Sequence, residues 1–383
     1  MIQWLIKTFK RIFGIRQEFC LVVEQFDDHL EAVYARVNNH KKKIKLVKRR
    51  KIKNFDKLRK PLAFIDRLVV ALDSRHATTL ESVVRLKRSK PQEIINEGEL
   101  DHLVFRGLWE FLNRYRSWVG KKMGISDLDL VLADVQIREV NLGSHKVFNP
   151  TGFKGREVFF RFRATFVPRS MADLVSKFRS WASDLLVVEN HSIVSLSIPE
   201  PTDFVVHLAE TRTCVFASRP EERLYCKECL WGAKNIPRAI ANTFSVDEDV
   251  AQAIVGRYLE NGVSPKVARI VDALIRSEFR ILLDMLNSIY NKRENFLVRP
   301  AIHFNFKSFV PRPEYLFSNN RLKSVDFANW ALREGYSFVG SGKKYFSSPL
   351  HQGTVALLQH SYTDAHYDFV NRLLKRRVRW LVS

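Results

Sequence analysis

Residues 203–219 read DFVVHLAETRTCVFASR, which is two apolar strands around a short polar turn. A strand–turn–strand of this layout suits phosphate binding, and such a turn normally carries a carboxylate and glycines that let backbone N–H groups approach the ligand. Here the same places hold His207, Ala209 and Glu210. The stretch is therefore either a phosphate loop without its chemistry or an ordinary hairpin.

Cysteine and histidine clusters offer other chemistry. Cys226 and Cys229 form a CxxC, which could be half of a zinc site or a redox pair. A structural zinc site needs two more ligands, and the sequence has no second CxxC, so we interpret the pair as two cysteines at the end of a strand. His360 and His366 are six residues apart, which is poor spacing for one helix face. We predict no metal site.

Residues 338–344, FVGSGKK, contain two glycines and two lysines but lack the full pattern of a phosphate loop. A flexible loop is the simpler interpretation. No Ser-His-Asp or Cys-His arrangement with a local signature is present in the sequence. We therefore predict no catalytic residue.

Length and composition indicate a globular chain of two to three domains or one large two-lobed domain, because it has 383 residues of which 46% are hydrophobic. No apolar run approaches the roughly 18–20 residues of a membrane-spanning helix, and the N-terminus lacks a secretory cleavage pattern. We expect a cytoplasmic protein. Lys and Arg number 63 against 41 Asp and Glu, a net charge of +22, which favours nucleic acid, an anionic membrane face or an acidic protein as partner.

Both ends of the chain read as short basic amphipathic helices, residues 1–16 and 369–383. Such helices can lie in a membrane interface, with tryptophan at the headgroup level. Packing against the protein's own core is the alternative. The side chains that we predict to contact the membrane are Trp4, Leu5, Phe9, Phe13, Leu373, Leu374, Arg376, Arg377 and Trp380.

Residues 41–60 contain twelve basic residues and one acidic residue. Lysines on an edge strand protect it from pairing with other chains. The same stripe could instead face an anionic ligand. The sequence leaves both interpretations open.

Periodicity predicts that each half of the chain opens with a three-strand meander, followed by helices and a returning strand. In the first half we expect strands at 19–26, 29–38 and 42–49, a helix within 55–74, a strand within 77–89, a helix over 97–124, strands at 128–142, 145–148 and 156–167, a helix at 170–184 and a strand at 191–198. In the second half, a third strand follows the hairpin, and helices are expected at 232–243, 247–260 and 264–292. This weak internal repeat indicates a duplicated, two-lobed fold.

Residues 141–160, NLGSHKVFNPTGFKGREVFF, contain a turn pattern that is similar to one found in a known protein family. A turn of Asn149, Pro150, Gly152 and Gly155 leads from a hairpin into a strand, and proline and glycine suit a turn through a fixed φ and a positive φ. This stretch resembles the insertion subdomain of the FtsA family of bacterial cell-division proteins, within the actin-like ATPase superfamily; the related PilM family of pilus proteins is similar.

The resemblance assigns the candidate nucleotide residues. In the superfamily, the first strand pair turns on Asp-x-Gly-Ser/Thr; here Glu24 stands at the Asp position and Phe26 at the Gly position, followed by Asp27 and Asp28. A phenylalanine there would block a phosphate, and the two aspartates would repel it.

The second motif, Asp-x-Gly-Gly/Glu-x-Thr, aligns with HLAETRT. His207 replaces the Asp and Ala209 the Gly, while Glu210 and Thr211 match. Histidine does not hold Mg²⁺ as a carboxylate does. The helix-start motif Gly-Gly-x-x-Ile-Thr resembles WGAKNIP, which keeps Gly232, includes Lys234 and departs at two other positions. The glycine pair that cradles adenosine has no counterpart.

The resemblance implies an α/β, two-lobed actin-like (ribonuclease H-like) fold with a small α+β insertion subdomain. The expected divisions are the amphipathic helix 1–16, the first lobe 17–95 and 170–200, the insertion 96–169, the second lobe 201–368 and the basic helix 369–383. We expect a pseudo-ATPase with no cofactor, or ATP and Mg²⁺ only if the degenerate site still binds.

The expected role is a non-catalytic scaffold on the cytoplasmic face of the cell membrane, in cell division or a related assembly. Its expected partners are an anionic membrane surface, cell-division or pilus-assembly proteins, and further copies of itself. The alternatives are a basic nucleic-acid-binding protein, a PilM-like pilus assembly protein and an ATP-binding actin homologue.

Overall fold

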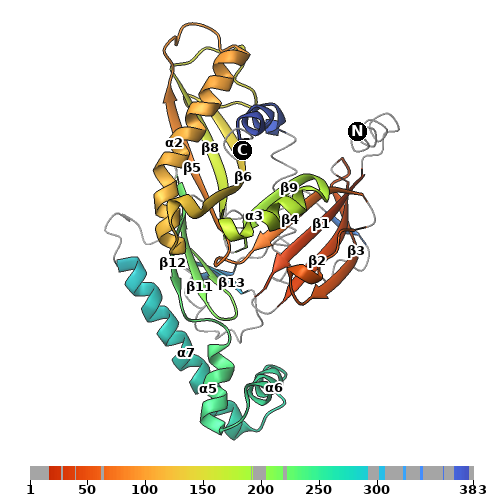
Figure 1. Ribbon diagram of the computed structural model, residues 1–383. Coiled ribbons are helices and arrows are strands. Elements are labelled where there is room, and N and C mark those ends of the chain that lie inside the picture. The colour runs from red at the N-terminus through yellow and green to blue at the C-terminus, as the bar shows by residue number, and fades with distance from the viewer. Residues whose placement is uncertain are drawn as a thin grey trace. The chain divides into compact units, whose positions relative to one another are not determined.

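Figure 1 shows the computed structural model of the protein. It describes residues 17–26, 29–38, 40–61, 64–190, 192, 204–218, 222–291, 302–306, 322–324, 337–339, 357 and 366–378. The chain divides into two compact units, each with its own core. Unit 1 contains residues 1–197, 221–224 and 327–383, and unit 2 contains residues 198–220 and 225–326.

The first sheet of unit 1 begins with the predicted meander of β1 (Gln17–Gln25), β2 (Leu30–Asn38) and β3 (Lys43–Ile52), which pair antiparallel. On the other side of β1 lie β4 (Ile65–Leu72) and β9 (Ala182–Glu189), both parallel to their neighbours. β15 (Ser337–Val339) pairs with the start of β3. The strand order is β15–β3–β2–β1–β4–β9.

The prediction of a helix within residues 55–74 is wrong. That segment contains a 3₁₀ turn at Phe55–Lys57 and then β4, in which Ile65 and residues 67–72 are buried. A parallel strand that is covered on both faces reads as a continuous apolar run. Such a run also satisfies helical spacing, so periodicity alone does not separate the two.

The predicted helix at 170–184 is shorter in the structure, where a 3₁₀ turn at Arg169–Met171 leads into α3 (Ala172–Arg179). Val175 and Phe178 of α3 pack with Trp181 in the core of the first sheet. The returning strand, predicted at 191–198, is β9 and begins at Ala182; residues 193–198 lie outside the described part. Helical spacing continues without a stop signal through this segment, which explains the error.

A second sheet of unit 1 has the order β12–β5–β8–β6–β7, and only the first residues of β12 belong to this unit. Its elements are β5 (Thr78–Lys87), β6 (Leu130–Leu142), β7 (His145–Lys146), β8 (Glu157–Pro168) and the start of β12 (Glu222–Cys229). β5 therefore pairs with β8, a strand of the predicted insertion. The long predicted helix is confirmed as α2 (Glu97–Met123), which packs along this sheet (Figure 1).

The ends of α2 follow local capping rules. The Asn96 side chain accepts a hydrogen bond from the backbone N–H of Glu99, and Gly124 takes a left-handed conformation after the last turn. Within α2, Gly107 allows close contact with Phe162 of β8, because a Cβ there would meet that ring at 3.1 Å.

Unit 2 contains a sheet of order β14–β13–β10–β11 with helices packed on it. The strands are β10 (Phe204–Leu208), β11 (Thr213–Ser218), β13 (Ile302–Phe306) and β14 (Leu322–Ser324). The three predicted helices are confirmed as α5 (Asn235–Phe244), α6 (Glu248–Leu259) and α7 (Pro265–Asn291). Their apolar faces and the hairpin strands form one core around Trp231 and Phe279, whose rings lie 5.6 Å apart.

Candidate functional site

The candidate residues of the first motif lie at the end of β1 in unit 1. Glu24 is 3% exposed and lies opposite Glu31, which accepts a hydrogen bond from Arg49. The Phe26 ring is 7% exposed and stacks on His29 with ring centroids 4.8 Å apart. Asp27 and Asp28 lie outside the described residues.

Two backbone groups at the start of this turn are hydrogen-bonded within unit 1. The Phe26 N–H donates to the His29 carbonyl at 2.8 Å, and the Gln25 carbonyl accepts from the Asn190 side chain at 2.8 Å. A phosphate-binding turn needs N–H groups that point to the ligand. Here the Phe26 amide has an acceptor within the protein, and a phenylalanine ring stands at the position where the resemblance predicts glycine.

The second motif lies at the β10–β11 hairpin of unit 2. His207 is 0% exposed within β10, opposite Cys214 of β11 and Asn305 of β13. Its imidazole is therefore part of the unit's interior. Ala209 is buried, and its N–H donates to the Arg212 carbonyl at 2.9 Å to close the turn, which contains Glu210 and Thr211.

The structure brings the helix-start motif against this hairpin turn. Ala233 N–H donates to the Ala209 carbonyl at 2.9 Å, and Lys234 N–H donates to the Glu210 carbonyl at 2.8 Å. The Lys234 ammonium lies 3.4 Å from a Glu210 carboxylate oxygen. The lysine charge is thus balanced by the neighbouring carboxylate, which leaves less attraction for an incoming phosphate.

Gly232 is required by this contact. A Cβ at that position would lie 2.5 Å from backbone atoms of Arg212, Glu210 and Thr211. Such a separation is far below ordinary contact distance, so only glycine lets the loop before α5 reach the turn. The retained glycine therefore serves close packing of two backbones here.

The predicted insertion turn forms as expected. Phe153 N–H donates to the Pro150 carbonyl at 3.2 Å, with Gly152 at φ +89° in the third position. Asn149 accepts from Thr151 N–H at 3.1 Å. Gly155 has a steric role, because a Cβ there would meet Leu142 at 2.6 Å.

Arg88 holds this turn to α2, and no sequence pattern predicted this role. Its side chain is 0% exposed and donates to both oxygens of Glu99 at 2.7 and 2.8 Å, and to the carbonyls of Gly155 and Glu93 at 2.9 Å. The Gly155 partner is 67 residues away in sequence. No local signal marks such a residue.

The C-terminal helix packs against unit 1, which corrects the membrane prediction for Leu373 and Leu374. The described part of this helix is 366–378; the two leucines are 2% and 0% exposed and lie in the core of the second sheet with Val370. Asn371 donates to and accepts from the backbone of Ile137 in β6, at 3.0 and 2.8 Å. The core-packing alternative is the one observed.

The basic side of the helix is also attached to unit 1. Arg377 forms an ion pair with Asp101 of α2, and Lys375 lies 3.2 Å from Asp184 of β9. Arg376 is largely exposed, 3.6 Å from Glu97. Trp380 and the N-terminal set of Trp4, Leu5, Phe9 and Phe13 lie outside the described residues.

The cysteine and histidine clusters of the sequence form no metal site within the described residues, where no group of three His, Cys, Asp or Glu side chains is placed to hold a metal ion. Cys229 is buried, and its burial raises the pKa of the thiol. His366 packs against Phe148, with ring centroids 5.0 Å apart. Within the described residues, no helix is both long and apolar enough to cross a membrane.

Comparison with solved structures gives the fold. A PilM–PilN type IV pilus biogenesis complex superposes with a TM-score of 0.53 at 14% identity, covering 89% of this chain and 98% of that chain. The chain has an actin-like ATPase fold.

MreB5 of Spiroplasma citri bound to AMPPNP has a TM-score of 0.41 at 8% identity, covering 91% of this chain and 98% of that chain. The cytoplasmic domain of EpsL of the Vibrio cholerae type II secretion system has a TM-score of 0.34 at 10% identity, covering 88% and 95%. No family model and no curated protein matches the sequence. The α/β, two-lobed fold expected from the sequence is confirmed.

Proposed function

We propose that this protein is a non-catalytic actin-fold scaffold that acts at the cytoplasmic face of a membrane through protein–protein contacts. The observation that carries the proposal is the internal use of the β10–β11 turn. Its carbonyls accept from the loop before α5, its carboxylate pairs with Lys234, and His207 is buried in the sheet. A nucleotide site would need these groups to face a ligand and Mg²⁺.

The β1–β2 turn supports the same conclusion independently. The Phe26 ring stacks on His29, and the Phe26 N–H donates to the His29 carbonyl, so this N–H already has a partner within the protein. Each unit therefore contributes one motif whose phosphate-binding groups are engaged elsewhere. A fold can persist when its site chemistry is lost, because its core depends on apolar burial.

Calorimetry with Mg-ATP on the full chain tests the absence of a cofactor. We expect no saturable heat at micromolar protein, while a nucleotide-binding actin-like protein measured in parallel gives a normal isotherm. Micromolar, Mg²⁺-dependent binding would refute the pseudoenzyme proposal and favour an ATP-binding actin homologue.

The partner class is proposed from the fold comparison. The solved structure that superposes with a TM-score of 0.53 is a PilM–PilN type IV pilus biogenesis complex. We propose that this chain likewise binds a protein of a membrane-associated assembly, in pilus assembly or cell division, and that copies of the chain associate. Cross-linking in the native cells followed by mass spectrometry should enrich such a protein together with this chain, and sedimentation at rising concentration tests self-association. Enrichment of cytosolic enzymes alone would contradict the scaffold role.

A further inference from the structure

The described part of the connection between β3 and β4 covers only part of the first sheet of unit 1. β3 runs parallel to β4, with β2 and β1 between them. A parallel crossover of this kind usually contains an α-helix that covers the sheet. Here the described part of the connection has only the 3₁₀ turn Phe55–Lys57, with Leu58 packed on the sheet. A cavity of about 900 Å³ lies between this connection and the strands.

The cavity has an aromatic side and a basic rim. Phe19 and Tyr34 line it and stack on each other, with ring centroids 6.2 Å apart. Six exposed basic side chains also line it, and we call them the basic rim: Lys48, Arg50, Lys51, Lys57, Arg59 and Lys60. Among the residues that the structure describes, none of these six forms an ion pair. A cluster of six cations at one cavity favours an anionic ligand.

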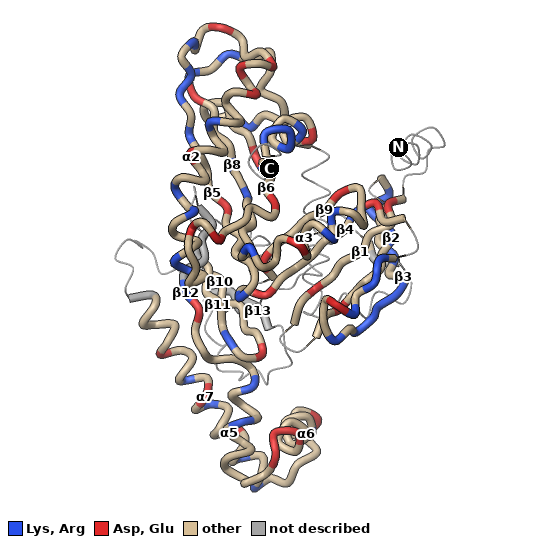
Figure 2. The backbone as a smooth tube through the Cα atoms, viewed as in Figure 1, with Lys and Arg blue, Asp and Glu red and all other residues tan. Residues whose placement is uncertain are grey.

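An exposed apolar side chain stands within this basic surface. The pairing of β2 with β3 shifts between Tyr34 and Ala35, which leaves Val47 without a Cα partner, and Val47 is 49% exposed. A ligand that binds in this cavity needs anionic groups to contact the basic rim and apolar groups to contact Val47, Phe19 and Tyr34. Phospholipids have this combination. Figure 2 shows the concentration of Lys and Arg along β3.

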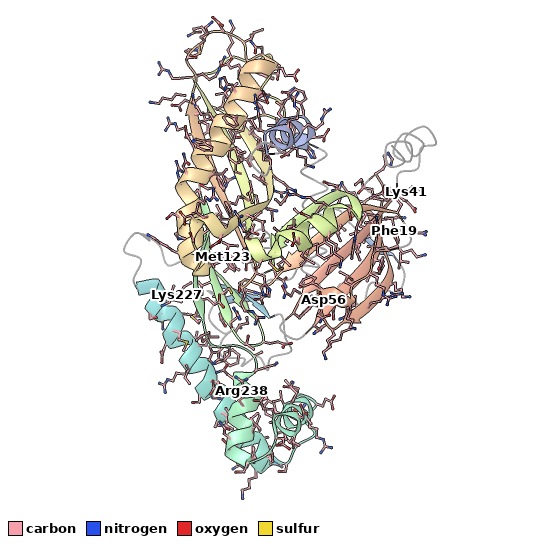
Figure 3. The ribbon with its side chains drawn as sticks, viewed as in Figure 1. Phe19, Lys41, Asp56, Met123, Lys227 and Arg238 are labelled. Atoms are coloured by element: carbon pink, nitrogen blue, oxygen red, sulfur yellow. The ribbon has the colours of Figure 1, made fainter. Side chains whose placement is uncertain are left out.

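The chain enters the sheet beside this surface. Residues 1–16, whose sequence is basic and amphipathic, precede Gln17, and the Cα partner of Gln17 is Asn38 at the end of β2. Asn38 accepts from Lys41 N–H in the turn that leads into β3. Phe19, two residues after Gln17, lines the cavity, and Figure 3 labels Phe19 and Lys41 at one end of the sheet.

We propose that the basic rim binds phosphate-bearing headgroups of an anionic lipid bilayer. The inference rests on the proposed membrane-scaffold function and assigns its lipid contact to this surface, since Leu373 and Leu374 are buried in the protein's own core. Single-stranded nucleic acid fits less well. It uses aromatic rings as platforms for successive bases, whereas Phe19 and Tyr34 stack on each other.

Vesicle co-sedimentation of the full chain tests the proposal. The probe is phosphatidylglycerol mixed with phosphatidylcholine, beside phosphatidylcholine alone. The test variant reverses three rim charges: Lys48→Glu, Arg50→Glu and Lys57→Glu. The control variant makes the same net charge change at exposed lysines elsewhere in unit 1: Lys87→Glu, Lys121→Glu and Lys154→Glu.

We expect salt-sensitive binding to the anionic vesicles only, a loss of at least about tenfold in affinity for the rim variant, and a much smaller loss for the control. Equal losses in both variants, or no vesicle binding by the parent chain, would overturn the assignment. Competition by free glycerol phosphate at low concentration would indicate a phosphate site that needs no bilayer. A gel shift with single-stranded oligonucleotide but no vesicle binding would instead identify a nucleic-acid surface. Thermal unfolding of each variant verifies folding.

Failure of this proposal and failure of the scaffold function give different results. If the chain still cross-links to a membrane-assembly protein while neither variant affects vesicle binding, only the rim assignment falls. If it binds Mg-ATP tightly, the scaffold function falls whatever the vesicles show.

Discussion

The packing of helix 366–378 makes a quantitative prediction for Leu374→Ala. Leu374 is 0% exposed in the core of the second sheet of unit 1, so the substitution removes three buried carbon atoms. Transfer alone costs about 0.8 kcal/mol per buried methylene group, or roughly 2.4 kcal/mol. With the cavity that remains, the measured range for such changes is about 2–5 kcal/mol.

Thermal unfolding, followed by circular dichroism, checks this value. For a domain of about 150–250 residues, a loss of about 3 kcal/mol lowers the Tm by roughly 6–12 °C. The matched control is Arg372→Ala on the same helix, where the side chain is 67% exposed, forms an ion pair with the exposed Asp368 and lies over the Phe369 ring. Its cost should stay below about 1 kcal/mol.

A lipid-anchoring helix would behave in the opposite way. If Leu374→Ala left the Tm unchanged and instead abolished vesicle binding, the leucine would face lipid and the packing argument would be refuted. A loss of stability with unchanged vesicle binding supports the packed helix.

Three further predictions concern single residues. Gly232→Ala would place a Cβ 2.5 Å from hairpin backbone atoms and should destabilise unit 2 by about 2 kcal/mol or more in urea unfolding, whereas Gly256→Ala, with nothing within 4 Å, should be neutral or stabilising by up to about 1 kcal/mol. Arg88→Met removes a buried guanidinium and its hydrogen bonds to the partly exposed Glu99 carboxylate, and should cost about 2–3 kcal/mol. The exposed Arg85→Met should cost less than about 1 kcal/mol, and similar Tm values for the two variants would show that Arg88 does not hold the turn to α2. Burial raises the pKa of Cys229 above its ordinary value of 9.0, so its alkylation, followed by mass spectrometry, should be slower than that of a cysteine in an unfolded peptide. The contribution of this thiol to folding stability is present below pH 9 and is lost as the pH rises through the raised pKa. Alkylation at the rate of an unfolded peptide would be inconsistent with burial.

Local sequence rules were sufficient where each element depends on its own neighbours. The caps at Asn96 and Gly124 delimit α2, and the positive φ of Gly152 belongs to its own turn. The helices α5, α6 and α7 were predicted to within a few residues, because long amphipathic periodicity and capping residues are local signals. The basic character of residues 41–60 was also visible in the sequence, although not the cavity that it borders.

Tertiary structure decided what long-range partners determine. Helical spacing in 55–74 described a buried strand, because burial on both faces by distant segments removes the alternation that marks a strand. The role of Gly232 depends on a hairpin twenty residues earlier, and that of Arg88 on a carbonyl 67 residues later. An amphipathic stripe such as that of helix 366–378 is the same whether it faces lipid or protein. Packing against lipid and packing against protein are distinguished only by the presence of β6 and α2 as partners. One of these contacts, between Asn371 and Ile137, joins residues 234 positions apart in the sequence.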